Sequence, residues 1–293
     1  MIMSNQLRSW LPNYLFAALI WGSSFYFIEV LLAVFHPTVV ALLRLTIGAV
    51  VLLTISYLMK LKLPFAIWRK LFIAGLFMNS IPGFLFAFAQ DYVSSILAGI
   101  LNAATPLMTL LFIVFIFKDQ KVSKNQVFGL LIGFAGVMIV LGVWTGLPSG
   151  QLVGVLAIIC ATAGYGFSLP YYRKNIIPLN YPPTAVMALQ VAISTLQILP
   201  FALFNSSLRA EFTWHIGFSA LMLGGLGSGV AYVMHYQVTK VAGAAIASSV
   251  TYLTPIVAAV AGVMLLNENL HWYEFAGALV VVIGILISQR QRR

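Results

Sequence analysis

Charged side chains are scarce in this sequence of 293 residues. Only 8% of the residues are Asp, Glu, Lys or Arg, whereas 61% are hydrophobic and the mean hydropathy is +1.01. A soluble domain carries about 25% charged residues. A surface this poor in charge would not stay in water. The composition therefore excludes an ordinary soluble protein and indicates that lipid covers much of the chain.

Cysteine pairs and cofactor motifs are also missing. The single cysteine, Cys160, can form no internal disulfide and has no partner at metal-ligand spacing. No phosphate-binding loop, zinc signature or dinucleotide fingerprint occurs, so we expect no cofactor, no metal and no ATP-driven activity. The net charge of +10 comes from basic residues that lie between apolar runs rather than in one tract. Nucleic acid is therefore not the expected partner.

Long apolar runs are what the sequence has in abundance. A membrane helix needs about 20 mostly apolar residues. Alternation with the period of a strand is absent, so we expect helices rather than a barrel. Ten segments qualify, and they are 12–34, 37–59, 70–90, 93–117, 124–143, 151–171, 182–204, 214–237, 242–266 and 272–289.

The sixteen lysines and arginines follow these segments in an alternating pattern. With a cytoplasmic N-terminus, fourteen of them lie on the cytoplasmic side, Arg209 lies outside, and Arg44 lies within the second helix. Miscounting one helix would destroy this bias, so it supports ten helices with both termini in the cytoplasm. The cytoplasmic residues are Arg8, Lys60, Lys62, Arg69, Lys70, Lys118, Lys121, Lys124, Arg173, Lys174, Lys240, Arg290, Arg292 and Arg293.

The sequence also repeats itself. Thr105-Pro106 in the fourth segment recurs as Thr254-Pro255 in the ninth, 149 residues later. Glycines and a following acidic residue recur at nearly the same offset. We predict two repeats, residues 1–146 and 147–293. The further matched pairs are Gly129 with Gly277, Gly136 with Gly284 and Asp119 with Glu268.

Five helices per repeat make an odd number, so the second copy must enter the membrane from the opposite side. The halves are then related by a pseudo-two-fold axis in the membrane plane, which is typical of secondary transporters with a site near the midplane. The predicted fold class is an all-α integral membrane protein with ten transmembrane helices in two inverted five-helix repeats.

Some of these residues also carry a family resemblance. They are Trp21-Gly22-Ser23-Ser24-Phe25 in the first helix, Arg44 in the second, Pro106 and Pro255, and the glycine-rich end of each half. The chain resembles the drug/metabolite transporter superfamily and, within it, the EamA family. The resemblance implies a carrier of the cytoplasmic (inner) membrane, commonly an exporter of amino acids or other metabolites. Similar proteins often have a lysine where this chain has Glu29, and this departure puts any substrate inherited from the family in doubt.

Two ionisable residues lie well inside the predicted membrane segments, Glu29 and Arg44. Each would cost roughly 2.5–3.5 kcal/mol at the bilayer centre. Both are predicted at roughly 7–11 Å below the outer surface, a depth that allows an ion pair. The pair could clamp the first two helices together. Alternatively, one or both residues could face a cavity and bind a charged substrate end or a coupling proton.

Polar and aromatic residues near the midplane are the candidates for substrate binding. Proline frees a backbone carbonyl about one turn earlier, near Asn102, and Thr251 with Pro255 repeats the pattern in the other half. We therefore expect helices four and nine, kinked at Pro106 and Pro255, to form the cavity walls. The predicted binding residues are Trp21, Ser24, Asn79, Asn102, Thr105, Tyr165, Gln190, Tyr232, Thr251 and Tyr252.

The leading functional hypothesis is a secondary transporter, not an enzyme, that exports small metabolites such as amino acids by alternating access. Its partners would be the lipid bilayer, a small-molecule substrate, and a proton or counter-substrate. One alternative is an intramembrane hydrolase, since Ser228 lies in a glycine-rich run and His235 follows two turns later. A non-transporting structural or sensory membrane protein is another. The oligomeric state is left open.

Overall fold

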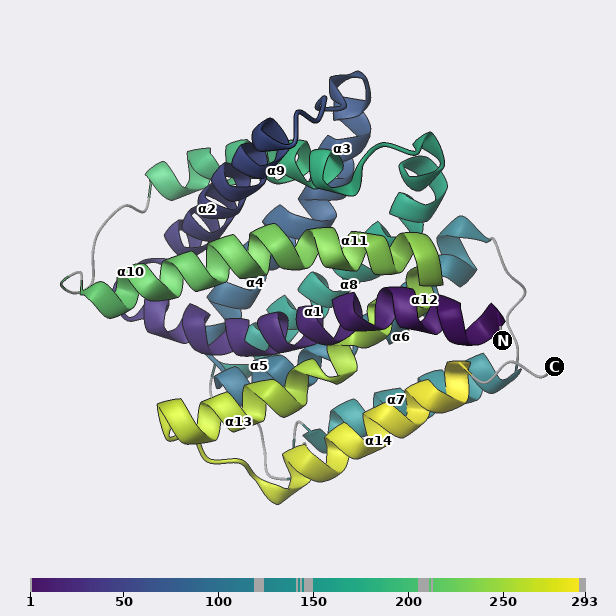
Figure 1. The fold of residues 1–293 in the computed structure, drawn as a ribbon. Coiled ribbons are helices and arrows are strands. Elements are labelled where there is room, and N and C mark those ends of the chain that lie inside the picture. Colours follow the sequence, from purple (N-terminus) through teal and green to yellow (C-terminus); the bar gives the residue numbers. More distant parts are fainter. Residues whose placement is uncertain are drawn as a thin grey trace.

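The computed structural model describes residues 2–118, 124–140, 142, 144, 150–204, 211 and 213–289, and the regular structure of these residues is entirely helical (Figure 1). Asp119, Lys121, Arg209, Arg290, Arg292, Arg293 and the repeat boundary at 146/147 lie outside these residues. The elements are α1 (Ile2–Leu32), α2 (Pro37–Leu58), η1 (Phe65–Ile67), α3 (Trp68–Gly75), η2 (Leu76–Ser80), α4 (Ile81–Gln90), α5 (Ser95–Asn102), α6 (Thr105–Phe112), η3 (Ile113–Phe117), α7 (Lys124–Val140), α8 (Gln151–Asn175), η5 (Ile177–Leu179), α9 (Pro183–Leu203), α10 (Trp214–Leu221), η6 (Met222–Val230), α11 (Ala231–Ala242), α12 (Ala244–Ser248), η7 (Ser249–Tyr252), α13 (Thr254–Leu266) and α14 (Trp272–Gln289).

Each of the ten predicted segments is mainly helical over its described residues. Within the described part of the chain, eight helical stretches are long and apolar enough to cross a membrane. Segments 124–143 and 272–289 form the shorter apolar helices α7 and α14. The eight stretches are Trp10–Leu32, Pro37–Leu58, Phe65–Gln90, Ser95–Phe117, Gln151–Leu179, Pro183–Leu203, Trp214–Ala242 and Ala244–Leu266.

The surface of the bundle is strongly apolar. Phe204 is 87% exposed and Met264 is 73% exposed, whereas the polar side chains of Asn79, Gln190 and Arg44 are buried. Lipid solvates apolar side chains and water does not, so this distribution suits a protein whose outer faces meet a bilayer.

The fourth and ninth segments are each broken into two pieces. A turn at 103–104 separates α5 from α6, and the 3-10 segment η7 separates α12 from α13. The two segments run in opposite directions and cross in the view of Figure 1. The first half of each contacts the second half of the other, since α5 contacts α13 and α6 contacts α12. Pro106 and Pro255 therefore lie in the first turn of a new helix rather than at a kink inside a continuous one. A proline costs least there, since the first N–H groups of a helix have no partner within it.

A π-helical segment brings the second and eighth spans into close contact. The segment is η6, whose sequence is MLGGLGSGV. A Cβ atom added at Gly48 of α2 would lie 2.9 Å from the carbonyl carbon of Ser228. One added at Gly224 would lie 2.6 Å from Cβ of Ile47. The glycines thus let the two backbones approach each other, as small residues do in membrane helices.

Glu268 links the last loop to the start of α5. One of its carboxylate oxygens accepts a hydrogen bond from the backbone N–H of Ser95 at 2.9 Å, and the other accepts from Ile96 at 3.0 Å. These are two of the N–H groups that a helix start leaves unpaired, and a negative charge there is favourable. Glu268, which the predicted repeat matches with Asp119, therefore caps the start of a helix in the other predicted half.

Helices α7 and α14 form a tight pair at one edge of the bundle (Figure 1). A Cβ atom added at Gly277 would clash with the backbone nitrogen of Val140 and lie 2.8 Å from the carbonyl oxygen of Gly136. One added at Gly284 would lie 2.5 Å from the nitrogen of Gly133. Gly136 on α7 and Gly284 on α14, which match in the predicted repeat, thus each lie against the other's helix.

We predict that Gly277→Ala lowers the thermal stability of the purified protein in detergent. The added methyl group meets backbone that cannot rotate away, and overpacking of this kind typically costs about 1–3 kcal/mol. Gly225→Ala is the matched control, because its Cβ atom would lie 3.8 Å from a side-chain carbon of Val51, an ordinary contact. Equal melting temperatures for the two variants would contradict the close contact.

Candidate functional site

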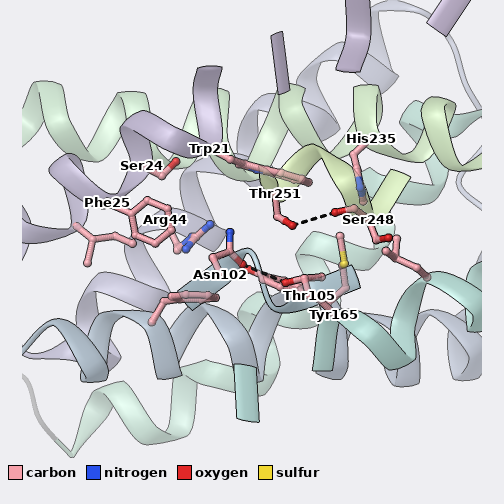
Figure 2. Close-up of a pocket in the computed structure, with 14 residues that line it drawn as sticks. Trp21, Ser24, Phe25, Arg44, Asn102, Thr105, Tyr165, His235, Ser248 and Thr251 are labelled. Carbon is pink, nitrogen blue, oxygen red and sulfur yellow. Dashed lines mark hydrogen bonds between the residues drawn. The ribbon is translucent and has the colours of Figure 1, made fainter. Parts of the chain in front are cut away.

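A pocket lies at the centre of the bundle, where the broken fourth and ninth spans meet the first, second, third, sixth and eighth (Figure 2). Its cavity volume is about 50 Å³, and the empty space between its walls, open solvent included, is about 550 Å³. Its walls combine aromatic rings, hydroxyl groups, one amide and one guanidinium. The lining residues are Trp21, Ser24, Phe25, Ile28, Arg44, Met78, Phe86, Asn102, Thr105, Tyr165, Leu169, His235, Ser248 and Thr251.

Among these fourteen lining residues, Arg44 is the one with a permanently charged side chain. The residue is 4% exposed. Its Nε donates a hydrogen bond to Oγ of Ser228 at 2.9 Å, and η6 holds that serine against α2. Among the described residues, this is the one hydrogen bond of the guanidinium. Arg44 is thus fixed at Nε while its terminal nitrogens extend into the pocket (Figure 2).

The two helix breaks place their polar residues beside one another. The Asn102 amide nitrogen donates to Oγ1 of Thr254 at 3.4 Å, and Oγ1 of Thr105 donates to Oδ1 of Asn102 at 3.2 Å. In the other span, Oγ1 of Thr251 donates to the carbonyl of Ser248 at 2.9 Å. This network joins the turn before α6 to the turn before α13. The irregular backbone therefore lies where protein covers it.

Aromatic rings form one part of the pocket wall. Phe86 stacks on Tyr165 with ring centroids 5.9 Å apart, and Phe25 meets Phe86 edge-on at 5.7 Å. The indole N–H of Trp21 donates to the carbonyl of Gly227 at 3.0 Å, which fixes this ring over the pocket. Such edge-to-face and offset arrangements are the favoured geometries of aromatic pairs.

His235 closes the pocket at the α11 side. Its Nε2 lies 2.9 Å from the carbonyl oxygen of Ala247, so this nitrogen carries a proton. Its ring packs edge-on against Trp21 with centroids 4.8 Å apart. The hydroxyl of Ser228 accepts from Arg44. Among the described residues no hydrogen bond joins Ser228 to His235, whereas a serine hydrolase needs its nucleophile and base within hydrogen-bond reach.

Six of the ten predicted binding residues line this pocket, and four do not. The six are Trp21, Ser24, Asn102, Thr105, Tyr165 and Thr251. Asn79 and Gln190 lie in a separate buried cluster, in which Nε2 of Gln190 donates to Oδ1 of Asn79 at 2.6 Å and to the hydroxyl of Tyr172 at 2.5 Å.

The other two predicted residues lie behind or outside the pocket. Tyr232 packs edge-on against Trp21, with centroids 5.7 Å apart, and so supports the wall from behind. Tyr252 lines a different groove, an apolar one between α13 and α14. Its hydroxyl is buried without a hydrogen-bond partner in the described structure.

The possible ion pair between Glu29 and Arg44 is not formed in the structure. Glu29 accepts a hydrogen bond from Nε2 of Gln90 at 3.2 Å, and Arg44 donates to Ser228. Depth along the helices was compatible with a pair, but depth does not give the direction in which each side chain leaves its helix. Glu29 is not part of the pocket lining.

Sequence reasoning missed several lining residues. Phe25, Met78 and Phe86 are apolar, so nothing in the sequence distinguishes them from ordinary packing residues. Ser248 could have been found, because it lies three residues before Thr251 and so on the same face of a helix. Within the described residues, no group of three or more His, Cys, Asp or Glu side chains could hold a metal ion.

Comparison with known proteins gives consistent matches over the whole chain. The sequence profile of the EamA-like transporter family matches residues 8–142 and again residues 152–289. An uncharacterized transporter of Archaeoglobus fulgidus is 24% identical over 93% of this chain and 95% of its own. The uncharacterized transporter YcxC of Bacillus subtilis is 28% identical over 69% of this chain and 67% of its own.

Two further similarities concern an export protein and a solved structure. A Salmonella typhimurium protein named "Probable amino-acid metabolite efflux pump" is 25% identical over 70% of this chain and 71% of its own. A solved structure titled "Crystal structure of protein" superposes with a TM-score of 0.68 at 20% identity, covering 94% of this chain and 95% of that one. The latter similarity shows the fold alone.

We predict that the hydroxyl of Ser228 stabilises the fold through Arg44. Ser228→Ala removes the acceptor of a buried charged donor, a loss worth about 1.5–3 kcal/mol. The same substitution should cost much less in an Arg44→Met background. Unfolding free energies in mixed micelles for the four proteins of this double-mutant cycle measure the coupling. An equal cost in both backgrounds would show that the bond contributes nothing.

Proposed function

The chain belongs to the EamA-like transporter family, and from this premise we propose that it is a secondary transporter of small metabolites that works by alternating access. The observation that carries the proposal is the central pocket, where a buried guanidinium and a hydrogen-bonded amide meet aromatic walls at two helix breaks. Pockets of this composition, mostly apolar with a few convergent polar groups, are typical of small-molecule sites.

The arrangement of the spans supports a pair of halves that move against each other. The family profile matches the chain twice, at residues 8–142 and 152–289, which agrees with repeats at 1–146 and 147–293. The crossing of the fourth and ninth spans and the facing glycines of α7 and α14 fit a pseudo-two-fold relation. In such inverted-repeat carriers, the site lies near the midplane and the halves rock around it.

The chain is a multi-pass membrane protein, and we propose that it has ten spans with both termini in the cytoplasm. Beyond the eight longer stretches, α7 and α14 are apolar and comprise 17 and 18 residues, which is within the range that crosses a bilayer. The N-terminal end of α1 and the C-terminal end of α14 lie at the same end of the bundle (Figure 1). The cytoplasmic membrane is the proposed location.

Energy for transport would come from a gradient or from a counter-substrate, because the sequence carries no ATP-binding motif. Glu29 is the candidate proton carrier, since its carboxylate lies within a span and bonds to the neutral amide of Gln90. The name of the Salmonella relative supports export, and amino-acid metabolites, as the first hypotheses to test.

We predict that the protein mediates counterflow in liposomes. Vesicles preloaded with one unlabelled metabolite should transiently accumulate the same labelled compound, because a carrier exchanges substrate through one site while a channel only dissipates the gradient. A panel of amino acids and organic acids gives the substrate. Asn102→Ala removes two hydrogen bonds at the helix break, and the initial rate should fall about tenfold or more, equivalent to about 1.4 kcal/mol.

Asn175→Ala is the matched control for this substitution. Its amide nitrogen bonds to the carbonyl of Tyr171 at the end of α8, and it does not line the pocket. Its rate should equal that of the wild type. If the two variants behave alike, the pocket is not the transport site. If no compound gives counterflow, the carrier mechanism itself is wrong.

Topology can be tested with single cysteines in a Cys160→Ser background. Lys62 and Asn269 are both exposed and lie in loops proposed to face opposite sides. We predict that a membrane-impermeant maleimide labels Asn269→Cys in intact cells, and Lys62→Cys only in inside-out vesicles. Labelling of both positions from the same side would overturn the ten-span arrangement.

A further inference from the structure

We propose that the substrate is a small organic carboxylate without an amino group, bound through its carboxylate to the terminal nitrogens of Arg44. The inference rests on the proposed function, and it names the substrate class of the same pocket. It would place the protein among carriers of organic acids rather than of zwitterionic amino acids.

The guanidinium of Arg44 has unused hydrogen-bond donors. Arginine carries five N–H groups, and only the Nε group has an acceptor among the described residues, the hydroxyl of Ser228. The four N–H groups of Nη1 and Nη2 therefore lack a protein partner in that part of the chain. The side chain is 4% exposed and points into the pocket (Figure 2). A carboxylate fits two of these donors at once, as in bidentate arginine pairs.

The pocket also lacks a compensating negative charge. None of its fourteen lining residues is Asp or Glu, and Glu29 bonds to Gln90 outside it. An isolated charge in a low-dielectric interior is costly unless it is paired. A bound anion would supply that partner, so occupancy of the pocket should stabilise the whole protein.

A second donor is available beside the guanidinium. The amide nitrogen of Asn102 has two hydrogens, and its one hydrogen bond goes to Thr254. Figure 2 shows the Asn102 side chain and the guanidinium end of Arg44 pointing toward each other. An oxyanion placed between them would therefore meet donors from both sides.

The remaining polar groups of the lining supply no negative charge to balance an ammonium ion. The hydroxyl hydrogens of Ser24, Ser248 and Thr251 already bond to backbone carbonyls, so the oxygens of these groups can accept hydrogen bonds but carry no charge. An α-ammonium group lies beside its own carboxylate and hence close to the Arg44 cation, and like charges repel strongly where water is excluded. The rest of the substrate would lie among Phe25, Phe86 and Tyr165, which favours an apolar or aromatic body.

Three probes that share a phenyl ring on a three-carbon chain test whether binding requires a net negative charge. They are 3-phenylpropionate, phenylalanine and 3-phenylpropanamide. At about pH 7 they are an anion, a zwitterion and a neutral amide. Isothermal titration of the purified wild-type protein in detergent should give a Kd for phenylpropionate at least about tenfold lower than for either other probe. Phenylpropionate should also raise the melting temperature more than the others do. Chloride and phosphate at the same concentration are the inorganic controls.

Variants at Arg44 identify the binding group. Arg44→Met should abolish the preference for the anion, and Arg44→Lys, which keeps the charge but loses the planar fork, should weaken phenylpropionate binding about tenfold. The Asn175→Ala protein should bind like the wild type. The three-probe comparison on the wild type remains decisive if Arg44→Met does not fold.

The outcomes separate this inference from the proposed function. Equal affinities for the three probes, equal protection by phosphate or chloride, or a preference that survives Arg44→Met would overturn the carboxylate site. Counterflow of phenylalanine in preference to phenylpropionate would keep the carrier and overturn the inference. Binding of phenylpropionate with no counterflow of any compound would keep the anion site and overturn the carrier.

Discussion

Lipid offers the backbone no hydrogen-bond partner, and this constraint governs where the chain can depart from regular helix. The breaks at the centre of the fourth and ninth spans satisfy this constraint in two ways. Their N–H groups bond locally, Ala103 to Ile100 and Leu253 to Val250. Residues of the breaks such as Ala103, Ala104 and Val250 are also buried among neighbouring spans. The pocket forms there, with polar groups of the breaks set among mostly apolar walls, because an irregular backbone is tolerated where protein covers it.

The position of the buried charge depends on a close helix contact. Arg44 needs an acceptor within the apolar interior, and Ser228 provides it only because glycines of η6 let that segment lie against α2. The π-helical turn and the glycine run are thus part of the electrostatics of the pocket. Their role is to hold one end of the guanidinium while the other end stays open to a ligand.

Much of the fold followed from the sequence, and less of the site did. Apolar run length located the long helical stretches, and six pocket residues were recognisable as polar or aromatic groups at the depth of the midplane. Side-chain direction was not recoverable, because each helix turns residues toward lipid, core or pocket according to its neighbours. Asn79 and Gln190 consequently bond to each other rather than to a ligand, and Glu29 bonds to Gln90 rather than to Arg44.

The carboxylate of Glu268 has a consequence for biosynthesis. The N–H groups of Ser95 and Ile96 begin a helix in the first half, yet their acceptor is translated 173 residues after Ser95. While the ribosome makes the intervening spans, these donors must be met by water or lipid headgroups at the membrane surface. The first half can therefore insert early but reaches its final hydrogen bonding only near the end of synthesis. A nascent chain stopped before this loop would still lack the acceptor of these two N–H groups, although Ser94 already caps the N–H of Leu97.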